Sequence, residues 1–175
     1  ISANNIFDIN RLGLSNSFES GKSLTLGFDY KIDYEKNNTK LFENSNSDQK
    51  DKYLEFKIAT VFRDTEENKI PISSTIDKKN SNIFGSINNQ LINNINVGYN
   101  FSIDNDLKTF ESHDLNSQIT INNFVTEFNY IEQRNEIGKN HILSNKTTYN
   151  IDKNNLLYFK TQRNKEISLT EYYDL

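Results

Sequence analysis

The sequence predicts an all-β chain, a segment of an antiparallel, up-and-down transmembrane β-barrel with about ten strands, part of a larger barrel. Apolar and polar residues alternate along segments longer than the roughly 5–6 residues usual for globular strands. Short connections rich in Asn, Asp and Gly, typical of tight turns, join these segments. Only 34% of the residues are hydrophobic and the mean hydropathy is −0.76, yet 12% are aromatic. A barrel wall suits this composition because alternate residues meet lipid while their neighbours face a wet lumen.

Composition and charge argue against several other classes of protein. Disordered chains are poor in aromatic residues, whereas this chain has 12 Phe and 9 Tyr. The net charge of −4 arises from 24 acidic and 20 basic residues scattered along the chain, so we expect no nucleic-acid partner. The absence of Cys excludes disulfides and thiolate metal sites within this sequence. No apolar run approaches the roughly 18 residues of a transmembrane helix.

The two ends of the sequence favour a piece of a longer chain. The sequence opens on Ile1 rather than Met and ends within the strand-like Glu171–Leu175. We therefore expect residues 1–175 to be part of a single outer-membrane β-barrel domain. A missing signal peptide then carries no information.

The clearest strand is predicted at Ser23–Glu35. One parity is apolar or aromatic throughout: Leu24, Leu26, Phe28, Tyr30, Ile32 and Tyr34. The other parity has no such residue: Ser23, Thr25, Gly27, Asp29, Lys31, Asp33 and Glu35. A helix would scatter both sets around its axis, and the segment is long enough for the about 9–11 residues of a membrane-spanning strand. Tyr30 and Tyr34 are expected in an interfacial aromatic girdle, although the high β-propensity of Tyr is an alternative explanation.

The same alternation predicts further strands along the chain. It is strong at Leu54–Phe62, Ile95–Ile103 and Phe124–Tyr130, where Val125 is an exception and Ile131 a second one just beyond. Weaker alternation covers Leu107–Ile121, His141–Ile151, Leu156–Asn164 and Ile167–Leu175, and two more strands are expected near Phe7–Ser15 and Asn82–Asn89.

The connections between these strands are of two kinds. Turn-forming residues predict tight hairpins at Glu19–Lys22, Asp104–Asp106, Asn122–Asn123 and Asp152–Asn155. Two longer polar stretches, Lys36–Lys52 and Asp64–Ser81, flank a single strand, which does not fit a barrel with short turns on one side only. We therefore expect one of them to fold into the lumen or to hold an extra short element.

No motif for catalysis or for metal or cofactor binding is recognised, and we expect no enzyme. Gly21-Lys22-Ser23 lacks the earlier Gly of a phosphate-binding loop and leads into a strand, so it is interpreted as a turn. Asp104-Asn105-Asp106 lacks the Gly and the distant Glu of a calcium loop. His113 and His141 have no partner at metal-ligand spacing and are expected in the lumen or in loops. The candidates for lining the lumen are Asp29, Lys31, Arg63 and Glu127.

Several ordered motifs resemble the barrel of the lipopolysaccharide-assembly protein LptD (organic solvent tolerance) family, in its alphaproteobacterial form. They cover nearly the whole chain: Arg11-Leu12, Ser20–Tyr30, Glu55–Lys57, Val61–Arg63, Ile70–Thr75, Ser81–Gly85, Tyr99–Leu107, Asn123–Thr126, Glu132–Asn135, Phe159–Asn164 and Leu169–Tyr173. Each piece alone is common among barrel strands, and it is their order and spacing that carry the resemblance.

The resemblance implies a location in the outer membrane and a role in lipopolysaccharide transport. It implies a large barrel plugged by an LptE-like lipoprotein and a periplasmic jelly-roll domain that receives lipopolysaccharide from a periplasmic bridge protein. Lipopolysaccharide would leave through a lateral opening between the first and last strands of the barrel. This chain would be barrel wall without the jelly roll or those seam strands, so the gate positions and the cysteines of the family have no counterpart in it.

Three alternatives stay open at this point. Another outer-membrane barrel, such as a nutrient receptor or a porin, would share the alternation and lack only the ordered motifs. A soluble β-sandwich or adhesin domain would bury the apolar parity between two sheets. A hydrolase on a β scaffold has the least support, because neither a nucleophile nor a distinct pair of carboxylates is apparent.

Overall fold

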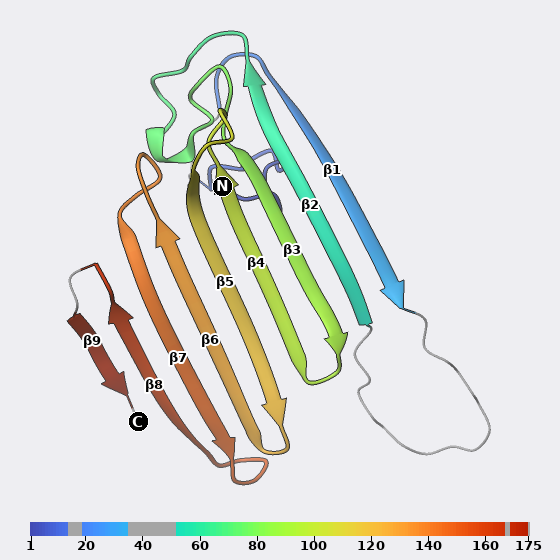
Figure 1. Ribbon diagram of the computed structural model, residues 1–175, viewed down its shortest axis with the longest axis vertical. Helices are drawn as coiled ribbons and strands as arrows, with labels where there is room; N and C mark the ends of the chain where they lie inside the picture. Colours follow the sequence, from blue (N-terminus) through green and yellow to red (C-terminus); the bar gives the residue numbers. More distant parts are fainter. Residues whose placement is uncertain (14–18, 35–51, 167–168, 175) are drawn as a thin grey trace.

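The computed structural model describes residues 1–13, 19–34, 52–166 and 169–174, and the described strands form one antiparallel sheet (Figure 1). Nine strands lie side by side in chain order: β1 (Ser23–Tyr34), β2 (Lys52–Arg63), β3 (Ile83–Ile92), β4 (Ile95–Ile103), β5 (Phe110–Ile121), β6 (Phe124–Gln133), β7 (Asn140–Asn150), β8 (Leu156–Asn164) and β9 (Leu169–Asp174). The all-β, antiparallel, up-and-down prediction is therefore confirmed. The sheet is open, because β1 and β9 do not pair with each other.

About ten strands were predicted and nine are present, because the first expected strand, Phe7–Ser15, is not formed in the described residues. Residues 7–13 form turns instead, and residues 14–15 lie outside the described part of the chain. The N–H of Asp8 bonds to the carbonyl of Asn5, and the N–H of Gly13 bonds to that of Asn10. These local bonds, which Asn favours, replace the ladder that a strand would need.

The register gives the sheet two continuous faces of different character. On one face Phe28 of β1 lies opposite Ile58 of β2, and Tyr99 of β4 lies opposite Leu115 of β5. We call this the apolar face. Its rows on β1 remain exposed, with Leu24 at 58% and Phe28 at 59%. The other face, which we call the covered face, carries Thr25, Asp29 and their register partners.

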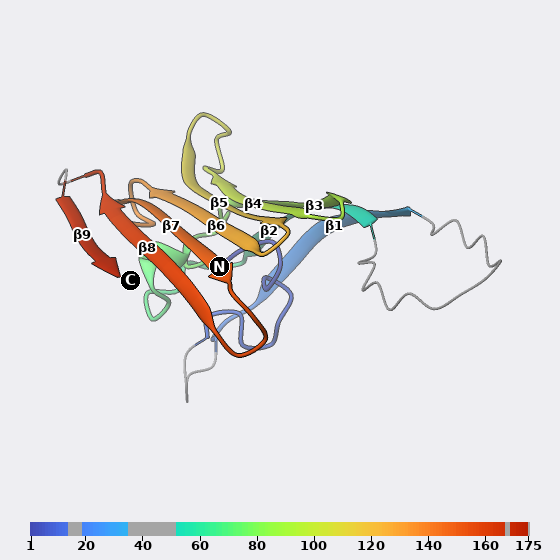
Figure 2. The ribbon, with the colours of Figure 1, turned by 90° about the horizontal axis from the view of Figure 1, so that it is seen from below.

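The buried core lies on the covered face. It consists of residues from the N-terminal segment (residues 1–13), from β2 and β3, and from the β2–β3 loop (residues 64–82): Ala3, Ile6, Ala59, Val61, Ile70, Ile76 and Phe84. Figure 2 shows the N-terminal segment and the β2–β3 loop on the same side of the sheet. The apolar rows predicted from the sequence therefore point away from the core, not into it.

The two edges where strands end carry different connections. At the lower edge in Figure 1, Asn93-Asn94 and Asn122-Asn123 join their strands as two-residue turns, and residues 151–155 join β7 to β8. The upper edge carries longer connections, residues 64–82, 104–109 and 134–139. The predicted turns at Asp104 and Asp152 are confirmed, because each carboxylate accepts hydrogen bonds from backbone N–H groups of its own connection.

The β2–β3 loop does hold an extra short element, as one of the two long polar stretches was expected to. A 3-10 helix spans Ile72–Ser74 and ends at Thr75, whose φ is 60°. The other stretch lies outside the described residues except for Lys52, which begins β2. β2 starts at the lower edge and ends at the upper edge, where the β2–β3 loop begins.

Candidate functional site

The N-terminal segment crosses the covered face and is fixed to several strands. The side-chain amide of Asn4 donates to Ser86 Oγ on β3 at 3.3 Å and to Asn100 Oδ1 on β4 at 3.2 Å. On β1 the Phe7 ring lies directly over Gly27, where an added Cβ would come within 2.6 Å of the ring. The glycine therefore allows the segment to approach the strand closely.

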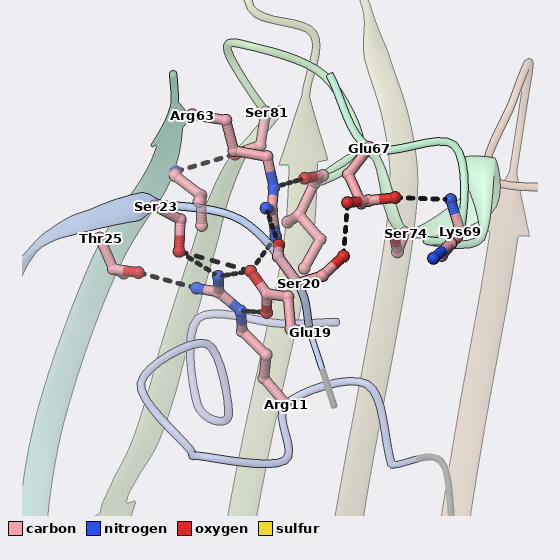
Figure 3. A network of polar contacts seen from close by, with 12 residues as sticks. Arg11, Glu19, Ser20, Ser23, Thr25, Arg63, Glu67, Lys69, Ser74 and Ser81 are labelled. Carbon is pink, nitrogen blue, oxygen red and sulfur yellow. Dashed lines mark hydrogen bonds and ion pairs between the residues drawn. The ribbon is translucent and has the colours of Figure 1, made fainter. Parts of the chain in front are cut away.

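A buried cluster of two arginines and one glutamate joins this segment to the end of the sheet (Figure 3). Arg11 and Arg63 both donate to the carboxylate of Glu19. Arg11 also donates to Thr25 Oγ1 at 2.7 Å and to Ser23 Oγ at 3.1 Å, both on β1. Because both arginines are at most 7% exposed, one carboxylate compensates two buried positive charges.

Backbone carbonyls supply the remaining partners of the two arginines. Arg63 donates to the carbonyls of Ser20, at 2.9 Å, and Ile76. Arg11 donates to the carbonyl of Ile6 at 3.2 Å. Burial lowers the pKa of the Arg11 guanidinium from its ordinary value, but arginine remains protonated at neutral pH. We call Arg11, Glu19 and Arg63 the arginine clamp; it ties the N-terminal segment, β1, β2 and the β2–β3 loop together.

Two carboxylates of the β2–β3 loop next to the clamp have shifted pKa values of opposite direction. The hydroxyl of Ser20 and the N–H of Lys69 donate to Glu67, which lowers the pKa of that carboxyl. Burial raises the pKa of the Asp77 carboxyl. Among the described residues, Asp77 Oδ1 is the buried side-chain oxygen without a hydrogen-bond partner.

A second buried network ties the upper connections together. Asn82 donates to Ser102 Oγ at 3.0 Å and to Glu111 Oε2 at 2.5 Å. Asn135, in the β6–β7 connection, donates to Glu111 Oε1 at 3.2 Å. Glu111 lies where the β4–β5 register shifts, and Phe110 pairs with Ile103 there. The irregularity places a carboxylate on the covered face, where it can bind both loops.

A polar cavity of about 440 Å³ opens between the N-terminal segment, the β2–β3 loop and β4–β6. Side chains on the covered face that border it include Asn100, Ser112, Asp114 and Gln133, with Phe84 and Ile131 as apolar wall. Ile131, an exception to the alternation of its strand, therefore lies where other segments cover the sheet.

All four candidates for lining the lumen lie on the covered face. Asp29 and Lys57 face each other across β1 and β2 with 3.7 Å between Oδ2 and Nζ, and Lys31 bonds Asp33 at 3.0 Å. Glu127 on β6 accepts a hydrogen bond from Gln118 at 3.5 Å. Arg63 differs from the other three because it is buried in the clamp. Arg63 therefore has a structural role, whereas Asp29, Lys31 and Glu127 lie outside the clamp on the covered face.

The two histidines, expected in the lumen or in loops, lie neither in loops nor on the covered face with the candidates for lining the lumen. His113 is in register with Phe101, and His141 with Glu132, so both lie in strands on the apolar face. Tyrosine hydroxyls satisfy them there, Tyr99 at 2.7 Å from His113 Nδ1 and Tyr130 at 3.2 Å from His141 Nε2. These bonds allow a polar ring on a face of otherwise apolar character.

No sequence motif connects the three residues of the clamp. Glu19 was assigned to a hairpin turn, and nothing in its spacing connects it to Arg11 or Arg63. The one available sign was the apolar Val61 in the polar parity of β2, which indicates that something packs on that face. Gly21, with a φ of 83°, leads into β1, but no described strand precedes it, so the hairpin expected at Glu19–Lys22 was wrong.

The described residues contain no group of three His, Cys, Asp or Glu side chains placed to hold a metal ion. In the same residues no helix is long and apolar enough to cross a membrane. Comparison with known proteins finds no matching family model, no matching curated protein and no matching solved structure.

Proposed function

We propose that this chain is wall of an outer-membrane β-barrel that takes part in lipopolysaccharide transport and assembly at the cell surface. The observation that carries the proposal is the separation of the faces. Exposed apolar rows run along one face, while the core, the N-terminal segment and the arginine clamp occupy the other. Lipid against the apolar face and a water-filled lumen against the covered face would match this separation.

The alternative of a soluble β-sandwich is less well supported. A sandwich needs a second sheet over the apolar rows, but all described strands belong to one sheet. Large exposed apolar patches are rare on soluble monomers and usually mark a partner or a membrane. A lipid partner explains why the exposed rows extend over many strands.

The lipopolysaccharide part of the proposal rests on the ordered motifs that resemble the LptD family. Under it, lipopolysaccharide, an LptE-like plug and a periplasmic bridge protein are the partners. Polar residues of the covered face, such as Asp29, Lys31 and Glu127, would then solvate sugars in transit. A receptor or porin remains the competing assignment.

Two neighbouring residues of β6 test the membrane part directly. These 175 residues contain no Cys, so Glu127→Cys and Phe128→Cys each add one thiol to them, on the covered and apolar faces respectively, and the unsubstituted protein gives the background labelling. In native membranes we expect Glu127→Cys to react with a water-soluble maleimide and Phe128→Cys to react only with a lipid-soluble one. Reaction of both thiols with the water-soluble reagent would refute a lipid-facing wall.

Depletion in the producing cell tests the transport part. We expect loss of lipopolysaccharide from the cell surface and its accumulation inside the outer membrane, measured by surface labelling. Normal surface lipopolysaccharide together with lost uptake of one solute would instead support a receptor or porin.

A further inference from the structure

A polar cluster interrupts the apolar face where β6, β7 and β8 reach the upper edge. Tyr130 is at its centre and donates its hydroxyl to Glu132 Oε2 at 2.7 Å. His141 Nε2 lies 3.2 Å from the same hydroxyl, and Lys165 Nζ lies 6.0 Å from the centre of the tyrosine ring. Arg134 completes the cluster by donating to Glu132 Oε1 through Nε at 2.8 Å. We call these five residues the Tyr130 cluster.

The cluster is placed at the boundary between apolar and polar surroundings. In β6 and β7 the next apolar-face residues toward the lower edge are Phe128 and Leu143, and Phe159 of β8 lies on the same face. Toward the upper edge the chain enters the connection 134–139 and, after β8, the exposed residues 165–166. If the apolar rows meet hydrocarbon, the Tyr130 cluster lies at the level of lipid headgroups.

The charge at this place is positive. Glu132 is shared by Arg134, so within the cluster it is already compensated. Among the described residues of β1–β8 and their connections, no carboxylate lies within ion-pair distance of Lys165 or of Arg163, which is exposed on the same face in register with Leu143. Two cations and a tyrosine–histidine pair are thus available to a ligand with one negative charge and several acceptor oxygens.

We propose that the Tyr130 cluster together with Arg163 binds the phosphodiester headgroup of an anionic membrane phospholipid, with the lipid chains along the apolar rows below it. Lysine and arginine attract a phosphate by charge, and the hydroxyl of Tyr130 can turn from Glu132 to donate to one of its oxygens. A phosphodiester carries a single negative charge, which the two cations can compensate without a third. The inference rests on the proposed membrane location and adds the lipid class and the site.

The test measures lipid retention by the full-length protein extracted from its native membrane in mild detergent. Native mass spectrometry counts the copies of phosphatidylglycerol that remain bound, with phosphatidylcholine, lipid A and inorganic phosphate as comparison ligands. The variants are Arg163→Gln and Lys165→Gln, and Lys153→Gln in the β7–β8 turn at the opposite edge is the matched control. We expect each cluster variant to weaken phosphatidylglycerol retention roughly fivefold, the effect of one cation near a lipid surface, and the control to leave it unchanged.

A third variant separates binding from folding. Tyr130→Phe keeps the ring and removes the hydroxyl, so it should lower retention of phosphatidylglycerol without altering the heat-modifiable mobility of the barrel. Equal loss in Lys153→Gln, preferred retention of lipid A, or competition by inorganic phosphate alone would overturn the inference. If the protein is inserted in the membrane and retention is the same in all variants, the inference fails while the barrel proposal stands. Recovery of the protein outside the membrane would remove the barrel proposal itself.

Discussion

Glu19 is the residue on which the covered face depends most, because it is the one carboxylate between two buried guanidinium groups. Removal of one partner from a buried ion pair costs about 3–5 kcal/mol, since the remaining charge stays desolvated. Glu19→Gln keeps the shape and removes the charge. We expect it to lower the unfolding free energy of the full-length protein by about that amount, measured by urea denaturation in lipid vesicles.

Glu136→Gln is the matched control for this substitution. Glu136 pairs with Lys78 between two connections, and both side chains are more than a third exposed. Exposed pairs contribute about 0–1 kcal/mol. An equal loss of unfolding free energy in both variants would contradict the prediction that the buried clamp contributes more than an exposed ion pair.

Asp77 should make the free energy of unfolding depend on pH with a sign opposite to that of a salt-bridged acid. Burial raises the pKa of its carboxyl above the ordinary value near 3.8, so the ionised form destabilises the fold. This penalty is absent when the pH is below the ordinary pKa of the carboxyl. It grows as the pH rises through the raised pKa of the folded protein. Asp77→Asn should therefore raise stability at pH 7, by up to about 1 kcal/mol, and have no effect at pH 3.

The comparison with Asp106→Asn makes this pH profile specific. Asp106 lies in an exposed turn, where Lys108 is 3.1 Å away. We expect its substitution to change the urea midpoint little at either pH. A gain from Asp77→Asn that persists in acid would show that its origin is not the buried charge.

For individual side chains, the alternation along a strand predicted which face each one lies on, and nothing more. Parity placed Asp29, Lys31 and Glu127 on the polar face, because register follows strictly once a strand is recognised. Parity did not reveal that Arg63 is buried, since burial depends on Arg11, Glu19 and Ile76, which are distant in sequence. The histidines were misplaced because residue type was weighed above parity.

At the scale of elements, the contact between Phe7 and Gly27 determines how closely the N-terminal segment lies on β1. A Cβ at position 27 would come within 2.6 Å of the Phe7 ring and 3.1 Å of Ala59 Cβ. Gly27→Ala should therefore destabilise the protein by about 1–3 kcal/mol, the usual cost of overpacking.

A double-mutant cycle tests whether the ring is the cause. In a Phe7→Ala background the added methyl has room, so Gly27→Ala should cost less than about 0.5 kcal/mol there. Urea denaturation of the four proteins measures both values. The same cost with and without the ring would point to Ala59 as the obstacle and contradict the assignment.

Strands were predictable where alternation is uninterrupted and less so at their ends. Leu156–Asn164 was predicted with the bounds that β8 has, whereas the expected Leu107–Ile121 begins three residues later as β5. Residues 104–109 form a turn there, with Leu107 at a φ of 60°. The expected strand at Phe7–Ser15 was wrong because turn formation at Asn5 and Asn10 outweighed a short apolar pattern.

At the scale of the whole molecule, the sheet has an apolar face and a covered face although it is not closed. The sequence could predict both faces, because each strand carries the same alternation. It could not predict that the N-terminal segment covers one of them. That covering depends on contacts between residues far apart in sequence, such as those of Asn4 with Ser86 and Asn100.

The open edges give the last prediction, which concerns the 175-residue chain by itself. Among the described strands, β1 and β9 each pair with one neighbour only. In hydrocarbon each unpaired backbone group costs several kcal/mol, so a free edge as long as β1, with 12 residues, costs on the order of tens of kcal/mol. Such an edge also invites pairing with other chains.

We therefore expect the isolated chain, refolded into detergent micelles, to aggregate or to remain unfolded, and not to form a heat-modifiable monomer. Electrophoresis of boiled and unboiled samples measures this, with the full-length protein as the positive control. The physical reason is closure: if the sheet is barrel wall as proposed, further strands have to pair with β1 and β9 before the apolar face can enter lipid. A monomer from the 175 residues alone that resists unfolding until boiled would mean that the two edges can satisfy themselves, and a larger barrel would no longer be needed.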